Sequence, residues 1–131
     1  MKRARLYPET KLKSAILAYL RTQQDVWAER RNSGSRRIVA KGMIQNIALG
    51  EPGTPDITGY LRAESWLASN GKTAPIAIPF GIEVKLEGSK LNENQKRWHA
   101  KAKRWGVEVC VARSIGEVRA FVEGMRRGEA P

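Results

Sequence analysis

Three charged residues, Asp56, Glu83 and Lys85, have the types and spacing of groups that could act together on a substrate. Glu83 and Lys85 lie at the end of IAIPFGIEVK (76–85), an apolar run that predicts a core strand. Because side chains alternate between the two faces of a strand, Glu83 and Lys85 share one face and Val84 lies on the other. Open α/β sheets bind their ligands at the carboxyl ends of strands, so this pair indicates a site.

Asp56 comes directly before ITGYL (57–61), a second run that predicts a strand. If this strand pairs antiparallel with the strand that carries Glu83, the two carboxylates approach each other. They would repel each other in a poorly solvated cleft, and a divalent cation between them removes that repulsion. Their oxygens and the main-chain carbonyl of Val84 are hard ligands suited to Mg²⁺, which polarises a phosphodiester and activates water. Lys85 could then orient the nucleophile and neutralise charge on the phosphate.

The elements that position these residues follow from periodicity and capping signals. A first helix is predicted from about Pro8 to Thr22, and a second from about Asn92 to Trp105, where Asn92 and Gln95 resemble a capping box. A last helix follows a second box at Ser114. The predicted strands are 26–31, 36–43, 57–61, 76–85 and 107–113. Because of Pro79, the strand at 76–85 is expected to begin in earnest at Phe80. The run 62–75 is interpreted as an excursion made of a short helix or a loop.

A strand, a helix and a further strand in this order predict that 80–85 and 107–112 are parallel neighbours. The fold class is therefore α/β with a mixed central sheet. A length of 131 residues and a hydrophobic content of 41% predict one domain, 1–131, with its core at about 7–125. No apolar run is long enough for a membrane helix, and no secretory signal is recognised. The single Cys110 is interpreted as a small buried hydrophobe, which fits a reducing cytoplasm.

Charge is the strongest global signal, because 24 Lys and Arg against 13 Asp and Glu give a net charge of +11. This balance favours a polyanionic partner, most simply nucleic acid, over a merely soluble basic surface or an acidic membrane. The segment 31–34 is either a DNA-contacting hairpin or an ordinary polar turn. The candidate DNA-binding residues are Arg31, Asn32, Ser33, Arg36, Arg37, Lys90 and Lys96.

Two further residues have both a structural and a functional interpretation. Gln95 is either a capping-box partner or a hydrogen-bond donor to the site, and Glu9 either meets the dipole of the first helix or supports the metal. His99 lacks nearby partners for zinc and is interpreted as a polar edge of the core or a phosphate contact. Trp98 and Trp105 are expected in the core rather than as base-stacking platforms.

Together, Pro55-Asp56 and Glu83-Val84-Lys85 form the signature of the PD-(D/E)XK nucleases. Over about residues 7 to 122 the sequence resembles the VRR-NUC (virus-type replication-repair nuclease) branch of that superfamily. The motifs that carry the resemblance are the opening helix with Glu9, RNSG (31–34), GTPDITG (53–59), GIEVK (81–85), LNENQ (91–95) and WGVEVCVARSIGEV (105–118).

The resemblance implies a restriction-endonuclease-like fold, an α-β-β-β-α-β core with a C-terminal helix, that cuts DNA with Mg²⁺ or Mn²⁺. It implies metal ligands at Asp56 and Glu83, a catalytic lysine at Lys85, and supporting roles for Gln95 and Glu9. Compact members are similar to Holliday-junction resolvases and tend to dimerise. The excursion at 62–75 makes the gap between Asp56 and Glu83 longer than in the leanest members.

The function expected from these observations is that of a metal-dependent endonuclease acting as a homodimer on branched DNA. Two alternatives remain open: a repair or restriction nuclease on linear, nicked or flap DNA, and a non-catalytic basic DNA-binding protein. The expected location is the cytoplasm of a bacterium or of a phage-infected host cell.

Overall fold

The computed structural model describes residues 7–31, 35–40, 43–48, 51–67 and 71–128. In chain order the elements are α1 (Tyr7–Arg21), β1 (Val26–Arg30), β2 (Ser35–Ala40), β3 (Met43–Ala48), β4 (Ile57–Leu67), β5 (Lys72–Val84), α2 (Glu93–Arg104), β6 (Glu108–Ala112) and α3 (Ile115–Arg126). None of the helices within these ranges is long and apolar enough to cross a membrane.

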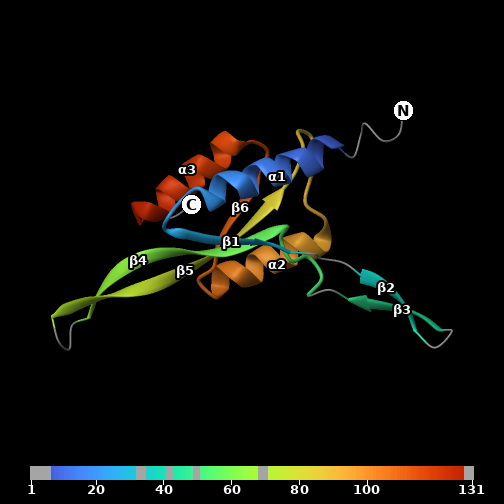
Figure 1. Ribbon diagram of the computed structural model, residues 1–131, viewed down its shortest axis with the longest axis horizontal. Helices are drawn as coiled ribbons and strands as arrows, with labels where there is room; N and C mark the ends of the chain where they lie inside the picture. The colour runs from blue at the N-terminus through green and yellow to red at the C-terminus, as the bar shows by residue number, and fades with distance from the viewer. Residues whose placement is uncertain (1–6, 32–34, 41–42, 49–50, 68–70, 129–131) are drawn as a thin grey trace.

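Four strands form the central sheet in the order β1-β4-β5-β6. β4 pairs antiparallel with β1 and with β5, whereas β6 pairs parallel with β5 from Phe80↔Glu108 to Val84↔Ala112. Helices α1 and α3 lie on one side of this sheet and α2 on the other (Figure 1). The arrangement confirms the predicted α/β class, the mixed sheet and the restriction-endonuclease-like fold.

The core lies between the sheet and the two helices α1 and α3. Apolar residues at helical spacing, including Ile16 and Leu20 of α1 and Val118 and Val122 of α3, are fully buried against the strands. Phe80 of β5 meets Phe121 edge to face, with ring centroids 6.2 Å apart. This packing holds the central strands in place and therefore fixes the sheet edge where Asp56 and Glu83 lie.

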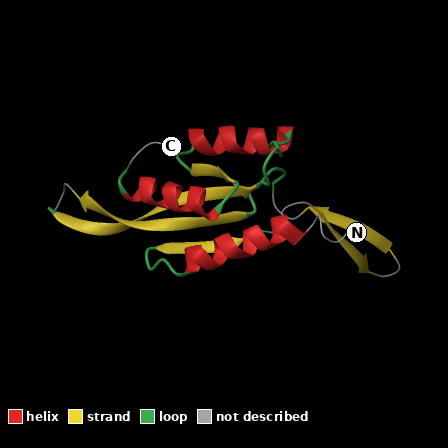
Figure 2. Cartoon of the chain, turned by 90° about the horizontal axis from the view of Figure 1, so that it is seen from above, coloured by secondary structure: helices red, strands yellow, loops and turns green. Residues whose placement is uncertain are grey.

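The interpretation of 62–75 as a short helix or loop is wrong for 62–67 and 72–75, which are strands, and residues 68–70 lie outside the described residues. β4 and β5 continue their antiparallel pairing from Arg62↔Ala77 to Leu67↔Lys72 and form a long ribbon that extends beyond the other strands (Figure 2). Pro79 does not interrupt the strand, because it pairs with Tyr60 on one side and precedes the first β6 partner on the other. Only the parallel pairing begins at Phe80.

The predicted strand at 36–43 is also corrected, because residues 36–40 belong to β2 and Met43 begins β3, while residues 41–42 lie outside the described residues. β2 and β3 pair with each other, Ser35↔Ala48 to Ala40↔Met43, as a hairpin apart from the central sheet (Figure 2). β1 pairs with β4 instead of β2. The segment 31–34 therefore does not join two paired strands as the turn of a hairpin, and residues 32–34 lie outside the described residues.

The capping signals explain where the second and third helices begin. Asn92 and Gln95 form the predicted capping box at α2, and Gly106 has the left-handed φ of 81° that ends the helix. At α3 the Ser114 side chain accepts from the backbone N–H of Glu117, as predicted. The Glu117 carboxylate, however, accepts from the backbone N–H of Arg113 instead of Ser114.

Candidate active site

The sheet register brings Asp56 and Glu83 to the same edge. Ile57 pairs with Ile82, so the residues one step further along, Asp56 and Glu83, stand opposite each other. Asp56 Oδ2 accepts from the backbone N–H of Val84 at 2.9 Å, which directs the carboxylate toward the end of β5. The backbone carbonyl of Asp56 accepts from the N–H of Arg31 at 2.7 Å, which ties the same residue to the end of β1.

Gln95 connects the start of α2 to the buried acid. Its Nε2 donates to Glu83 Oε1 at 2.7 Å, and its Oε1 accepts from the backbone N–H of Asn92 at 2.9 Å. The amide therefore completes the capping box and contacts the site at the same time. Both interpretations of Gln95 describe the structure, because the two ends of one amide group make the two contacts.

Glu83 is the most constrained acid of the cluster, with only 3% of its surface exposed. Its pKa is raised to about 8, first because burial penalises the charged form and second because the Asp56 carboxylate lies nearby. The ammonium groups of Lys85 and Lys13 oppose this rise. Glu83 Oε2 is buried without a hydrogen-bond partner, so the carboxyl group has one unused acceptor.

Lys13 of α1 is a member of the cluster that the sequence interpretation missed. Its Nζ lies 3.1 Å from Asp56 Oδ1 and 3.8 Å from Glu9 Oε1. The lysine thus stands between Glu9 and Asp56. Glu9 has its place on the buried face of the first helix, and Lys13, four residues later, lies on that same face. This spacing is the signal that could have identified it.

Lys85 follows β5 and is half-buried. Its backbone N–H donates to the carbonyl of Ala112 at 3.0 Å, which extends the β5–β6 pairing to the edge of the site. Its side chain is close enough to Glu83 to lower the pKa of that carboxyl. The geometry therefore brings together Asp56, which directly precedes β4, Glu83 of β5, and Lys85, which directly follows β5.

A close contact holds the loop before β4 against α2. Gly53 has a φ of 88°, and a Cβ built on it would lie 2.1 Å from the carbonyl oxygen of Asn94. Gly81 provides room for the ring of Pro55, whose Cγ would be 2.9 Å from a Cβ at that position. These two glycines let the Pro-Asp segment approach both Gln95 and Glu83.

The donor atoms at this edge fit a divalent cation. The Asp56 and Glu83 carboxylates offer hard oxygens, and the unpartnered Oε2 of Glu83 is an acceptor that a cation would satisfy. The ammonium of Lys13 already places one positive charge against Asp56. No group of three or more His, Cys, Asp or Glu in the described part of the chain is arranged to hold a metal.

The candidate DNA-binding residues are spread over several elements. Arg31 is exposed and its Nε donates to Thr58 Oγ1 at 2.7 Å, while Lys90 and Lys96 are exposed near the start of α2. Lys96 also pairs with Glu93 at 3.4 Å. The backbone of Arg36 and Arg37 lies in β2. Asn32 and Ser33 lie outside the described residues.

The remaining predictions concern His99, Trp98, Trp105 and Cys110, and the one for Trp105 is wrong. His99 is buried with its Nε2 unpartnered, and burial lowers its pKa, which agrees with a position at the edge of the core. Trp98 is half-buried, whereas the prediction that Trp105 packs in the core is wrong, since 78% of its surface is exposed. Trp105 is the C-cap residue of α2, where the helix ends. Cys110 is partly buried against the core, and burial raises its pKa to about 12.

A mixed sheet with a Pro-Asp before one strand and Glu-Val-Lys at the end of the next is the arrangement of a PD-(D/E)XK-type nuclease. The VRR-NUC domain family matches residues 5–115, which is most of the chain. The chain therefore belongs to the VRR-NUC domain family, and the family implies a nuclease that has DNA as its substrate. Comparisons with curated proteins and with solved structures give no match.

Proposed function

We propose that the protein is a divalent-metal-dependent DNA endonuclease that hydrolyses phosphodiester bonds, with a preference for branched DNA. The observation that supports this proposal best is the convergence of Asp56, Glu83 and Gln95 at one sheet edge, where Gln95 Nε2 holds Glu83 Oε1 at 2.7 Å. A solely DNA-binding protein would gain nothing from a buried acid with an unpartnered oxygen beside a second carboxylate.

Asp56, Glu83 and the main-chain carbonyl of Val84 would hold Mg²⁺ or Mn²⁺. When bound, the cation polarises the phosphodiester and lowers the pKa of water, which provides the nucleophile. Lys85 neutralises charge that builds up on the phosphate, and Gln95 keeps the Glu83 carboxylate in one orientation. Lys13 neutralises Asp56 when no metal is present, and Glu9 in turn orients Lys13.

The preference for branched DNA and the homodimer belong to the same proposal. Two copies related by a twofold axis would place two sites so that each cuts one strand of a four-way junction. The net charge of +11 supplies the long-range attraction to a substrate of several phosphate backbones.

The test is to incubate the protein with synthetic four-way, flap, nicked and linear DNA in Mg²⁺, in Mn²⁺ and in EDTA. We expect cutting in either metal, no cutting in EDTA, and the highest rate on the four-way junction. If linear, nicked or flap DNA is cut at least as fast as the four-way junction, the protein is instead a repair or restriction nuclease that acts on those substrates. Tight binding of every substrate with no cutting in either metal would indicate an architectural DNA-binding protein.

A further inference from the structure

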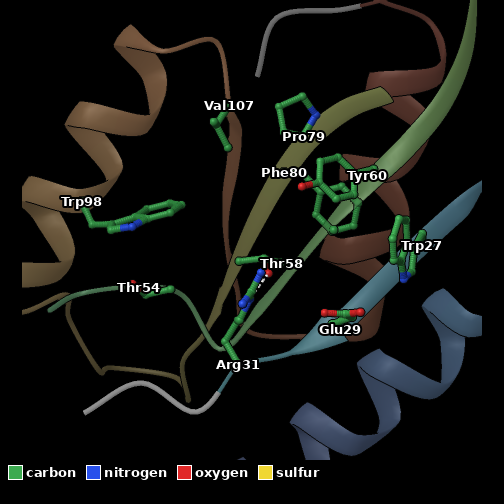
Figure 3. A pocket seen from close by; sticks show the side chains of 11 residues that line it. Trp27, Glu29, Arg31, Thr54, Thr58, Tyr60, Pro79, Phe80, Trp98 and Val107 are labelled. Atoms are coloured by element: carbon green, nitrogen blue, oxygen red, sulfur yellow. Dashed lines mark hydrogen bonds between the residues drawn. The ribbon is translucent and has the colours of Figure 1, made fainter. Parts of the chain in front are cut away.

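A groove beside the candidate active site is lined by aromatic side chains that the proposed chemistry does not use. It has a volume of about 510 Å³, which is within the range of small-ligand sites. Trp98 of α2 lies on one side and Trp27 of β1 on the other, with Arg31 and Thr58 between them (Figure 3). We call this feature the aromatic groove.

The aromatic groove is linked to the catalytic edge by residues that lie close to Asp56 in the sequence. Asp56 directly precedes β4, and Thr58 and Tyr60, which share one face of that strand, both line the groove. Thr54 and Thr58, on either side of Asp56, both line the groove. A strand of nucleic acid with a phosphate at Asp56 could therefore place a neighbouring nucleotide in the groove.

Two aromatic rings in this region are unusually open to solvent. Trp27 is 65% exposed and Tyr60 is 44% exposed, and their ring centroids are 5.7 Å apart. The same two rings border a second hollow, formed with Pro75 and Ile76 of the β4–β5 ribbon. Exposed aromatic pairs of this kind are suited to stacking against a flat, apolar partner.

The charged residues of the aromatic groove favour a base over a phosphate. Arg31 is fixed by its bond to Thr58, and its planar guanidinium can stack on a base or donate to it. Glu29 also lines the groove, and its carboxylate would repel a phosphate but can accept from the amino group of a base. The phosphates would then lie outside the groove, where the net positive charge of the protein attracts them.

We infer that the aromatic groove binds an unpaired nucleobase of the DNA strand that enters the active site, with Trp27 and Tyr60 as its stacking platform. This inference rests on the proposed function, which supplies the statement that the bound strand is DNA entering a nuclease active site. A base can reach these rings only when it is unstacked, as it is in a single strand, at a flap or at a junction. The groove would thus favour branched or single-stranded DNA over an intact duplex.

The test is binding in EDTA, so that cutting does not enter the measurement. Fluorescence anisotropy gives the Kd of a labelled single strand and of the blunt duplex formed from it, at one low salt concentration. We expect Trp27→Ala to weaken single-strand binding about tenfold and to leave duplex binding unchanged, since stacking on one aromatic ring contributes that order of affinity. Trp27→Phe keeps a ring and should retain most of the affinity.

Trp105→Ala is the matched control, because Trp105 is also an exposed tryptophan but lies outside the aromatic groove. It should bind both DNAs as the wild type does, and circular dichroism should show that all variants are folded. The inference is overturned if Trp27→Ala binds the single strand normally or weakens both DNAs equally. It is also overturned if sedimentation shows that Trp27→Ala only dissociates a dimer, because the groove would then hold a second copy. If the wild type binds the single strand through Trp27 but cuts none of the DNAs in Mg²⁺ or Mn²⁺, the proposed function alone is overturned.

Discussion

Gln95 Nε2 donates a hydrogen bond to Glu83 Oε1 at 2.7 Å, while the Oε1 of the same amide accepts from the backbone of Asn92. One side chain therefore fixes the start of α2 and the orientation of a buried acid. The capping contribution and the site contribution of Gln95 can be separated, because Asn92 takes part only in the cap.

Gln95→Ala should lower the cutting rate by about tenfold or more, since removing a group that orients a metal ligand has effects of this size. Asn92→Ala is the control, which loses the cap at a cost of about 1 kcal/mol but leaves the Glu83 contact. Cutting rates and thermal melts of both variants are the measurements. Equal cutting rates for the two variants would show that Gln95 acts only as a cap.

Lys13→Met should strengthen Mn²⁺ binding by about three- to tenfold, because the ammonium 3.1 Å from Asp56 Oδ1 competes with a cation for that carboxylate. Isothermal titration calorimetry measures the affinity. Lys11→Met removes an exposed lysine from the same helix and should leave the affinity unchanged. Weaker Mn²⁺ binding by Lys13→Met would mean that Lys13 supports the metal site instead of competing for it.

Glu83 should make the metal-free protein less stable as the pH rises. Its pKa is raised from 4.5 to about 8 in the folded state, so between these values the folded protein binds more protons than the unfolded chain. The stabilisation is present below pH 4.5 and is lost as the pH rises to about 8. Glu83→Gln, which cannot ionise, should therefore raise Tm at pH 8.5 by about 5 °C in EDTA. Parallel Tm curves against pH for the two proteins would contradict the raised pKa.

Gly53→Ala should destabilise the protein more than Gly88→Ala. Both glycines have a positive φ, 88° and 82°, so each substitution has a similar backbone cost of about 1 kcal/mol. Only the Cβ at Gly53 would collide with α2, 2.1 Å from the carbonyl oxygen of Asn94, whereas Gly88 has open space. We expect Gly53→Ala to cost about 3 kcal/mol or more in urea unfolding. Similar losses for the two variants would show that the loop shifts without strain.

The sequence predicts the central elements because local signals and the fold agree there. The Asn92 capping box, the Gly106 stop and the apolar run through Val84 each specify a local conformation that packing then uses. These features depend on short-range periodicity, which a single sequence shows directly.

Other features depend on long-range contacts that a single sequence does not show. The β4–β5 ribbon was missed because 62–75 mixes polar residues, glycine and proline, and only pairing between the strands makes them extended. The ion pair between Lys13 and Asp56 joins a helix to a loop that lies far along the chain. Trp105 was assigned to the core by its helical spacing, but α2 ends there and exposes the ring.

The central claim is tested most directly by the cutting rate of Asp56→Asn in Mg²⁺, measured on the DNA that the wild type cuts fastest. The substitution removes one of two neighbouring carboxylate charges, and an amide oxygen can still accept from the N–H of Val84. We predict no detectable cutting by a variant whose circular dichroism spectrum and DNA affinity match those of the wild type. Cutting by Asp56→Asn at the wild-type rate would contradict the assignment of the active site.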